Sequence, residues 1–161
     1  MANRPSLWNA LLGAAVHLVR GRRYRHRVIE AGSGEPLILV HGVGSSAEVF
    51  ARNVMPLAER FHVYAVDALY HGHSSLEPYD AVNRVRTQAN ALLDFMNALD
   101  IRRAHMEGES MGAGMVFDLA MRHPDRSMAA TFPAEFPLVV DADGFWSINE
   151  QDERVKDFPP G

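Results

Sequence analysis

The segment Arg103–Arg122 constrains the fold most, because it joins a strand pattern to a helix pattern through a tight turn. Ala104–Glu107 predicts a short buried strand, and from Met111 apolar residues recur at helical spacing until Pro124 ends the run. Between the two patterns stands G-E-S-M-G, with Ser110 at its centre. A strand, a sharp turn and a helix in this order predict a nucleophile elbow.

Each residue around Ser110 has a physical role in that prediction. Gly108 and Gly112 leave room for the close approach of neighbouring backbone. The N–H of Met111, at the start of the expected helix, can donate to an oxyanion as it develops. The alternative interpretation is an ordinary Gly-Ser turn.

The rest of the chain alternates strand and helix patterns. The unbroken apolar runs Pro36–Val40, Phe61–Val66 and Pro137–Val140 predict strands buried on both faces, and Arg22–Ile29 predicts a strand at the margin of the sheet. Ala81–Leu99 carries the most regular helical spacing in the chain. The alternation predicts an α/β fold with a mainly parallel sheet flanked by helices.

One further segment, Ala47–Arg60, has helical character. Pro56 predicts a break or restart within it, because proline lacks the N–H that a helix interior uses.

Candidate polar residues follow the predicted strands, at the sheet edge where α/β proteins bind ligands. They are His41-Gly42-Val43-Gly44 after the first apolar run, Asp67 with a histidine-containing loop after the second, Ser110, and Asp141 with Asp143.

Composition excludes several function classes. The net charge of the 161 residues is −4 and 47% are hydrophobic, which is typical of a globular protein and not of a nucleic-acid binder. The chain has no cysteine, which excludes disulfides and thiolate metal sites and is compatible with a cytoplasmic location, the one we expect.

The first 21 residues are interpreted as a separate element, and residues 22–161 as one core. Residues 1–27 hold six arginines and no acidic residue, and Ser6–Val19 has the spacing of an amphipathic helix. Such a helix can pack on its own domain or on a partner subunit. Alternatively, a basic amphipathic helix can anchor the protein at a membrane surface. The expected helix over Ser6–Val19, which contains Trp8, and an exposed sheet edge also suggest that the protein forms a homo-oligomer.

Three motifs carry a resemblance to a known family. P-L-I-L-V-H-G-V-G-S-S, F-H-V-Y-A-V-D-A-L-Y-H-G-H-S and H-M-E-G-E-S-M-G-A-G-M resemble, in order and spacing, the α/β-hydrolase family over about Arg22–Gly144. Within it, A-R-N-V-M-P-L-A-E-R-F-H-V-Y-A-V-D is most similar to hydrolases that cleave carbon–carbon bonds in ring-fission products of aromatic degradation; related esterases share most of this pattern. The resemblance implies a small-molecule carbonyl substrate, and we expect no cofactor.

Carried over by position, the resemblance implies that Ser110 is the nucleophile. The N–H of Met111 then forms one half of the oxyanion hole, and the N–H of Val43 forms the other, with Gly42 or Gly44 close by.

The same resemblance implies structural roles for His41, Asp67 and His71. An obvious alternative makes His41 a catalytic base, but a triad is recognised by geometry and not by proximity in sequence. A metal site of Asp67, His71 and His73 is a further alternative, although no clear additional ligand accompanies them. We therefore expect no metal.

One departure from the family is severe. The family's triad runs serine, acid, histidine, and the one histidine after Ser110 is His123, at the far end of the predicted helix. Asp141 or Asp143 can serve as the acid or belong to a strand-end turn. Ser127–Phe136 reads as an insertion, because the family passes from P-D-R almost directly into its next strand.

The sequence therefore predicts the amino-terminal part of a serine hydrolase, ending at the start of the family's lid. The alternative is a non-catalytic binding or interaction protein that retains a hydrolase-like sheet.

Overall fold

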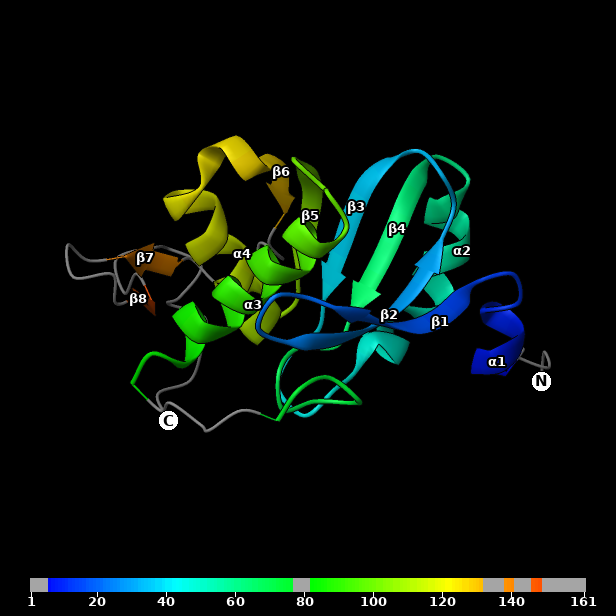
Figure 1. Ribbon diagram of the computed structural model, residues 1–161, viewed down its shortest axis with the longest axis horizontal. Coiled ribbons are helices and arrows are strands. Elements are labelled where there is room, and N and C mark those ends of the chain that lie inside the picture. The colour runs from blue at the N-terminus through cyan, green and yellow to red at the C-terminus, as the bar shows by residue number, and fades with distance from the viewer. Residues whose placement is uncertain (1–5, 77–81, 132–137, 141–145, 149–161) are drawn as a thin grey trace.

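A central sheet with helices on both of its faces organises the molecule (Figure 1), for which the computed structural model describes residues 6–76, 82–131, 138–140 and 146–148. The elements in chain order are α1 Leu7–Ala10, β1 Ala15–Arg20, β2 Arg25–Ala31, β3 Glu35–Val40, the 3-10 helix η1 Ala47–Phe50, α2 Ala51–Ala58, β4 Phe61–Val66, α3 Arg84–Ala98, β5 Ala104–Gly108, α4 Met111–Arg122, the 3-10 helix η2 Pro124–Arg126, β6 Ser127–Thr131, β7 Leu138–Val140 and β8 Trp146–Ile148.

The main sheet has the strand order β1-β2-β4-β3-β5-β6. β1, β2 and β4 pair antiparallel, whereas β4, β3, β5 and β6 pair parallel. The predicted fold class, a mainly parallel sheet flanked by helices, is confirmed.

Strand β3 explains why its sequence is an unbroken apolar run. Ile38 and Val40 pack in one core cluster with residues of α3 and α4, whereas Leu37 and Leu39 pack in a second cluster with residues of α2. Successive side chains of a strand point to opposite faces, so a strand covered on both faces has no polar position.

The predicted helix over Ser6–Val19 is wrong. Helix α1 has one turn, Gly13 follows it with a φ of 100°, and β1 then pairs with β2 along its whole length. Of the predicted apolar stripe, Trp8 is 72% and Leu12 is 74% exposed, whereas Leu11 and Val19 are buried in two different core clusters, so the stripe does not form one buried helical face. The apolar residues from Val16 onward also fit a strand, and pairing with β2 decides between the two. The membrane-anchor hypothesis loses the helix on which it depended.

Within the segment 1–21, interpreted from the sequence as a separate element, β1 belongs to the main sheet. For the same reason β2 lies between β1 and β4 and not at the margin of the sheet, as Arg22–Ile29 had predicted.

The strand after α4 was also placed wrongly. The chain passes from η2 directly into β6, which pairs parallel with β5. The predicted insertion, Ser127–Phe136, therefore begins with a strand of the main sheet. Leu138–Val140 is a strand, but it pairs antiparallel with β8 in a separate two-stranded sheet. The sequence predicted the strand after α4 at Pro137–Val140 instead, because the valines there form a stronger apolar pattern than the small residues of Ser127–Thr131.

Pro56 does not break α2, which runs through it. The proline removes one backbone bond, to the carbonyl of exposed Arg52, while Ala51 and Val54 keep the helix packed on the sheet. The discontinuity lies instead at Phe50, where η1 passes into α2.

Within the described ranges, no helix combines the length and the apolar character that crossing a membrane requires.

Candidate active site

Ser110 lies in the sharp turn between β5 and α4. Its backbone angles, a φ of 52° and a ψ of −112°, lie in a region that residues other than glycine rarely adopt, and its side chain is exposed. The turn is fixed on both sides, because the Glu109 N–H donates to the Val40 carbonyl at 2.9 Å and the Gly112 N–H donates to the Glu109 carbonyl at 2.8 Å. The backbone therefore presents Ser110 at the carboxyl end of the parallel strands.

Both glycines of the G-E-S-M-G motif stand where backbone approaches backbone. A Cβ at Gly108 would lie 2.3 Å from the carbonyl carbon of Gly112, and a Cβ at Gly112 would lie 2.1 Å from the Val40 carbonyl oxygen. No side chain fits at either position without a shift of main chain, so the start of α4 packs directly on the ends of β3 and β5.

The turn after β3 lies beside Ser110. A Cβ at Gly42 would be 3.2 Å from the Ser110 Cβ, so the two backbones are near contact. The Gly42 N–H donates to the Glu109 Oε2 at 3.3 Å, and the Gly44 N–H donates to the His71 Nε2 at 3.1 Å. Two of the candidate donors in this turn are thus already engaged.

The N–H groups of Val43 and Met111 differ from these. Neither donates to an acceptor in the part of the chain that the structure describes. Met111 begins α4, so its N–H also has no acceptor one turn earlier in the helix. Two unused donors therefore belong to the two turns that meet at Ser110.

His41 is fully buried with both ring nitrogens engaged. Its Nε2 accepts from the Ala68 N–H at 3.0 Å, so Nδ1 carries the proton and donates to the Gly42 carbonyl at 2.7 Å. Burial lowers the pKa of His41, against opposing hydrogen-bond and charge effects. The ring ties the turn after β3 to the loop after β4, and no lone pair is left to accept a proton from Ser110.

The carboxylate of Asp67 is likewise engaged in hydrogen bonds with neighbouring residues. Its buried carboxylate accepts from the Ala47 N–H at 2.7 Å, from the His73 N–H at 3.1 Å and from Arg27 Nη1 at 3.3 Å. A Cβ at Gly72 would lie 1.8 Å from the Asp67 Oδ2, so only glycine fits there. Asp67 therefore holds the loop after β4 against η1 and β2.

His71 completes this bracing. Its Nδ1 donates to the Leu69 carbonyl at 2.8 Å, while its Nε2 accepts from Gly44. Among the described residues no group of three histidine, aspartate or glutamate side chains is arranged to hold a metal ion. The loop geometry explains these residues without one.

Sequence reasoning missed two charged residues near the site. Arg27 reaches from β2 to both Asp67 and Glu48, and Glu109 accepts from Gly42. Although burial opposes ionisation of Glu48, hydrogen bonds from Arg27 and Ser46 lower its pKa to about 2. The sequence could flag Arg27 as a charge within a strand pattern, but its partners are distant in sequence. Glu109 occupies the variable position of the motif, which carries no signal.

No described histidine hydrogen-bonds to Ser110. His123 caps the carboxyl end of the 12-residue α4, about 18 Å of helical rise away from the serine. Asp141 and Asp143, the two candidate acids, lie outside the described residues. The described chain thus brings together the serine and the donors but not a base.

Comparison with known proteins identifies a matching family and shows how much of its relatives' length the chain spans. The profile described as "alpha/beta hydrolase fold" matches residues 35–152. The 2-hydroxymuconate semialdehyde hydrolase of Pseudomonas sp. (strain CF600) is 30% identical over 154 residues, covering 91% of this chain and 51% of that protein.

Two solved structures resemble the chain in the same way. A bacterial membrane phospholipase A has a TM-score of 0.69 at 34% identity, covering 76% of this chain and 40% of that one. Epoxide hydrolase A from Mycobacterium thermoresistibile has a TM-score of 0.73 at 25% identity, with coverages of 80% and 41%. The chain thus spans about half the length, or less, of these relatives.

Proposed function

Since the chain belongs to the α/β-hydrolase fold family, we propose that it carries the nucleophile and the oxyanion hole of a serine hydrolase. Its relatives include the 2-hydroxymuconate semialdehyde hydrolase, a meta-cleavage product hydrolase of the kind that the sequence resemblance predicted. Its substrate is a small molecule with a carbonyl group, and the reaction is hydrolysis of a carbon–carbon bond or an ester. The observation that carries the proposal is the exposed Ser110 at a φ of 52°, beside two turns in which the N–H groups of Val43 and Met111 donate to no described acceptor.

The proposed chemistry begins with attack of the Ser110 Oγ, or of a water that it assists, on the carbonyl carbon. The carbonyl π electrons move to its oxygen, and the N–H groups of Val43 and Met111 donate to the oxyanion that forms. Donors fixed before the reaction stabilise this charge without reorganising, and loss of one such donor typically costs about 100- to 1000-fold in turnover. The dipole of α4, whose amino end faces the serine, adds to the same effect.

A base must take the Ser110 proton, because a serine hydroxyl is a weak nucleophile at neutral pH. His41 is unsuited, since both of its nitrogens are engaged. We propose that the base and its acid come from sequence beyond the described residues, with Asp141 and Asp143 as candidate acids.

An activated-serine probe tests this directly on the full-length product of the native gene. A fluorophosphonate should label Ser110, and Ser110→Ala should abolish both labelling and turnover of ester substrates while leaving the thermal melting temperature nearly unchanged. Ser33→Ala is the matched control, because Ser33 is exposed in the turn between β2 and β3 at the opposite edge of the sheet. Normal turnover in Ser110→Ala would overturn the proposal.

A second candidate function is binding without catalysis, favoured by one observation: no described group accepts a hydrogen bond from the Ser110 hydroxyl. A binding protein would keep the loops and the sheet but would not activate the serine. Failure of the probe to label the full-length product, together with retained binding of a carbonyl ligand in isothermal titration, would favour this function.

A further inference from the structure

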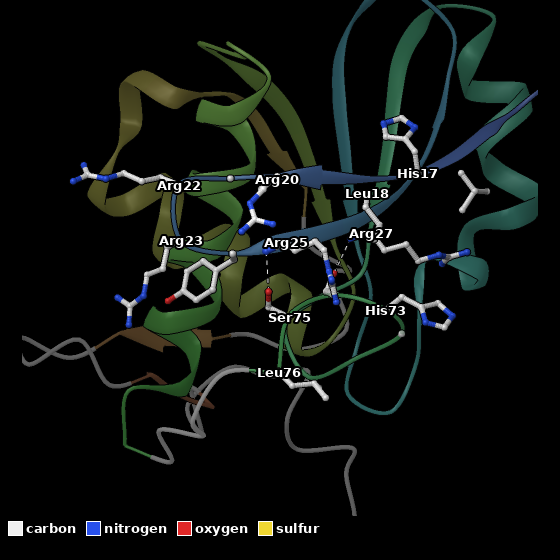
Figure 2. Close-up of a pocket in the computed structure, with 15 residues that line it drawn as sticks. His17, Leu18, Arg20, Arg22, Arg23, Arg25, Arg27, His73, Ser75 and Leu76 are labelled. Carbon is white, nitrogen blue, oxygen red and sulfur yellow. Dashed lines mark hydrogen bonds between the residues drawn. The ribbon is translucent and has the colours of Figure 1, made fainter.

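A hollow of the described surface lies away from Ser110, over the β1–β2 hairpin. It has a volume of about 910 Å³ and is open to solvent. Its walls are the hairpin and the loop after β4, and Figure 2 shows Arg20 and Arg25 between the two, with Arg22 and Arg23 extending outward from the hairpin turn. The lining residues with side chains that matter below are Val16, Leu18, Arg20, Arg22, Arg23, Arg25 and Leu76.

The described lining of the hollow is cationic. Among the residues that the structure describes, no aspartate or glutamate lines it, and the side chains of Arg20, Arg22, Arg23 and Arg25 form no ion pair. Arg27 is the exception in the lining, because it is paired with Asp67 and Glu48 beneath the surface.

Asp94 fixes the hairpin turn without pairing with these guanidinium groups, of which that of Arg23 lies 5.2 Å from the centroid of the Tyr24 ring. Its carboxylate lies below the hairpin turn and accepts from the backbone N–H groups of Arg22 at 3.0 Å and Tyr24 at 3.1 Å, and it also contacts buried His26. This carboxylate is therefore occupied by main chain and by histidine. The turn is held in place while the side chains of Arg22 and Arg23 point to solvent.

Apolar side chains stand beside the charges. In the β1–β2 register Leu18 faces Arg27 and Arg20 faces Arg25, so Leu18 and Arg20 share one face of the hairpin. Leu18 is 52% exposed and Leu76, in the facing loop, is 80% exposed. Val16 continues the same row toward Leu12 and Trp8, which are exposed as well. Cations and unburied apolar groups thus occur together, on one strand and its flanks.

From this arrangement we infer that the hairpin face binds the surface of an anionic phospholipid bilayer. Guanidinium groups match lipid phosphates in geometry and charge, and exposed leucine and tryptophan side chains enter the boundary between headgroups and acyl chains. A nucleic acid would satisfy the arginines but not Leu18 and Leu76. The whole chain carries a charge of −4, so the attraction arises from this local cluster and not from overall charge.

The position of the face relates it to Ser110. Ser75 binds the start of β2 in both directions, as its N–H donates to the Arg25 carbonyl and its Oγ accepts from the Arg25 N–H, each at 2.8 Å. The same loop carries His71, which holds Gly44 beside the serine. Docking of the hairpin face brings the sheet edge that carries Ser110 toward the bilayer. The lipid contact itself does not depend on the proposed hydrolase activity.

Vesicle co-sedimentation with the full-length protein tests the inference. The protein should bind vesicles of mixed phosphatidylcholine and phosphatidylglycerol, release at high salt, and bind pure phosphatidylcholine weakly. Arg20→Gln/Arg22→Gln/Arg23→Gln should weaken binding on the order of 100-fold, from a contribution of about fivefold per arginine at such a surface. The matched control is Arg52→Gln/Arg60→Gln/Arg102→Gln, which removes the same charge from exposed positions outside the hollow.

Three results would overturn the inference. Equal weakening by the control triple would mean that net charge alone acts, and equal binding to both vesicle types would exclude recognition of anionic lipid. Displacement of the protein from vesicles by millimolar inorganic phosphate at constant ionic strength would mean a simple phosphate site.

The variant Leu18→Ser/Leu76→Ser measures the apolar contribution to vesicle binding. It should weaken binding at every salt concentration, and unchanged binding would contradict insertion into the bilayer. Circular dichroism of each variant confirms that it is folded.

Discussion

Gly112 and Val40 are in direct backbone contact, so close that a Cβ on the glycine would lie 2.1 Å from the Val40 carbonyl oxygen. This contact docks the amino end of α4 onto the end of β3 and sets the position of Ser110 relative to the turn after β3. The geometry of the site thus depends on a position that carries no functional group.

Gly112→Ala should therefore destabilise the protein by about 1–3 kcal/mol, the usual cost of forcing an extra methyl group into a packed interior. Urea denaturation followed by circular dichroism measures the loss. Ala113→Ser is a useful comparison, because it changes the next residue of the same helix without demanding space between two backbones. A Gly112→Ala variant as stable as the parent would show that α4 can shift away from β3 without cost.

Ser110 holds a backbone conformation that glycine adopts more readily, so Ser110→Gly should be more stable than Ser110→Ala. Relief of about 1–3 kcal/mol of strain exceeds the added freedom of glycine in the unfolded chain, about 0.5–1 kcal/mol, and we expect a net difference of about 1 kcal/mol. Both variants lack the hydroxyl, so the comparison isolates the backbone. Equal midpoints in urea would mean that the turn relaxes and stores no strain.

Arg27 compensates a carboxylate, that of Asp67, whose side chain is 0% exposed. Arg27→Met should cost about 3 kcal/mol of folding stability, because removal of one partner leaves a buried charge with only its backbone donors. The control is Arg86→Met, which removes a pair with Asp118 at 3.8 Å from a side chain that is 51% exposed, and should change stability by less than about 1 kcal/mol. Similar losses in the two variants would mean that the Asp67 pair contributes no more than a surface pair.

Burial lowers the pKa of His26 and of His41, so stability should fall as the solution becomes more acidic. A histidine whose folded pKa lies below its unfolded value of about 6.5 binds more protons when unfolded, and the free energy of unfolding therefore decreases as pH falls below about 6.5. Hydrogen bonds from backbone N–H groups and from His26 also lower the pKa of Asp94, against the effect of its burial, which extends the same trend below about pH 4.

Urea midpoints measured from neutral to acidic pH test this trend, and His26→Asn should flatten the part of the slope that His26 causes. A midpoint independent of pH between neutrality and pH 5 would contradict the assignment.

Much of the fold could be predicted because its information is local. β4 and β3 are covered on both faces, which forces unbroken apolar runs, and glycine, serine and proline mark the turn at Ser110 and the end of α4. The N-terminal segment failed for the opposite reason. Its apolar spacing fits a helix and a strand alike, and the choice is made by pairing with β2, a contact between distant residues that no local pattern records.

The site shows the same division. The motif predicted where Ser110 stands, whereas the partners of Glu109 and Arg27 depend on how three loops pack at the sheet edge. The structure gives His41 two hydrogen bonds, and its structural role stays a prediction.

His41 provides the sharpest test of how the two turns cooperate. Because its ring bridges the Gly42 carbonyl and the Ala68 N–H, His41→Gln should lower stability by about 1–3 kcal/mol and turnover through misplacement of the Val43 N–H, while leaving the pH profile of turnover unchanged in shape. A base removed from the reaction would instead change the acidic limb of that profile and abolish labelling by a fluorophosphonate. The measurements are turnover against pH and the rate of labelling in the full-length protein. Loss of labelling together with an altered limb would make His41 the base and would mean that its ring turns away from Ala68 during the reaction.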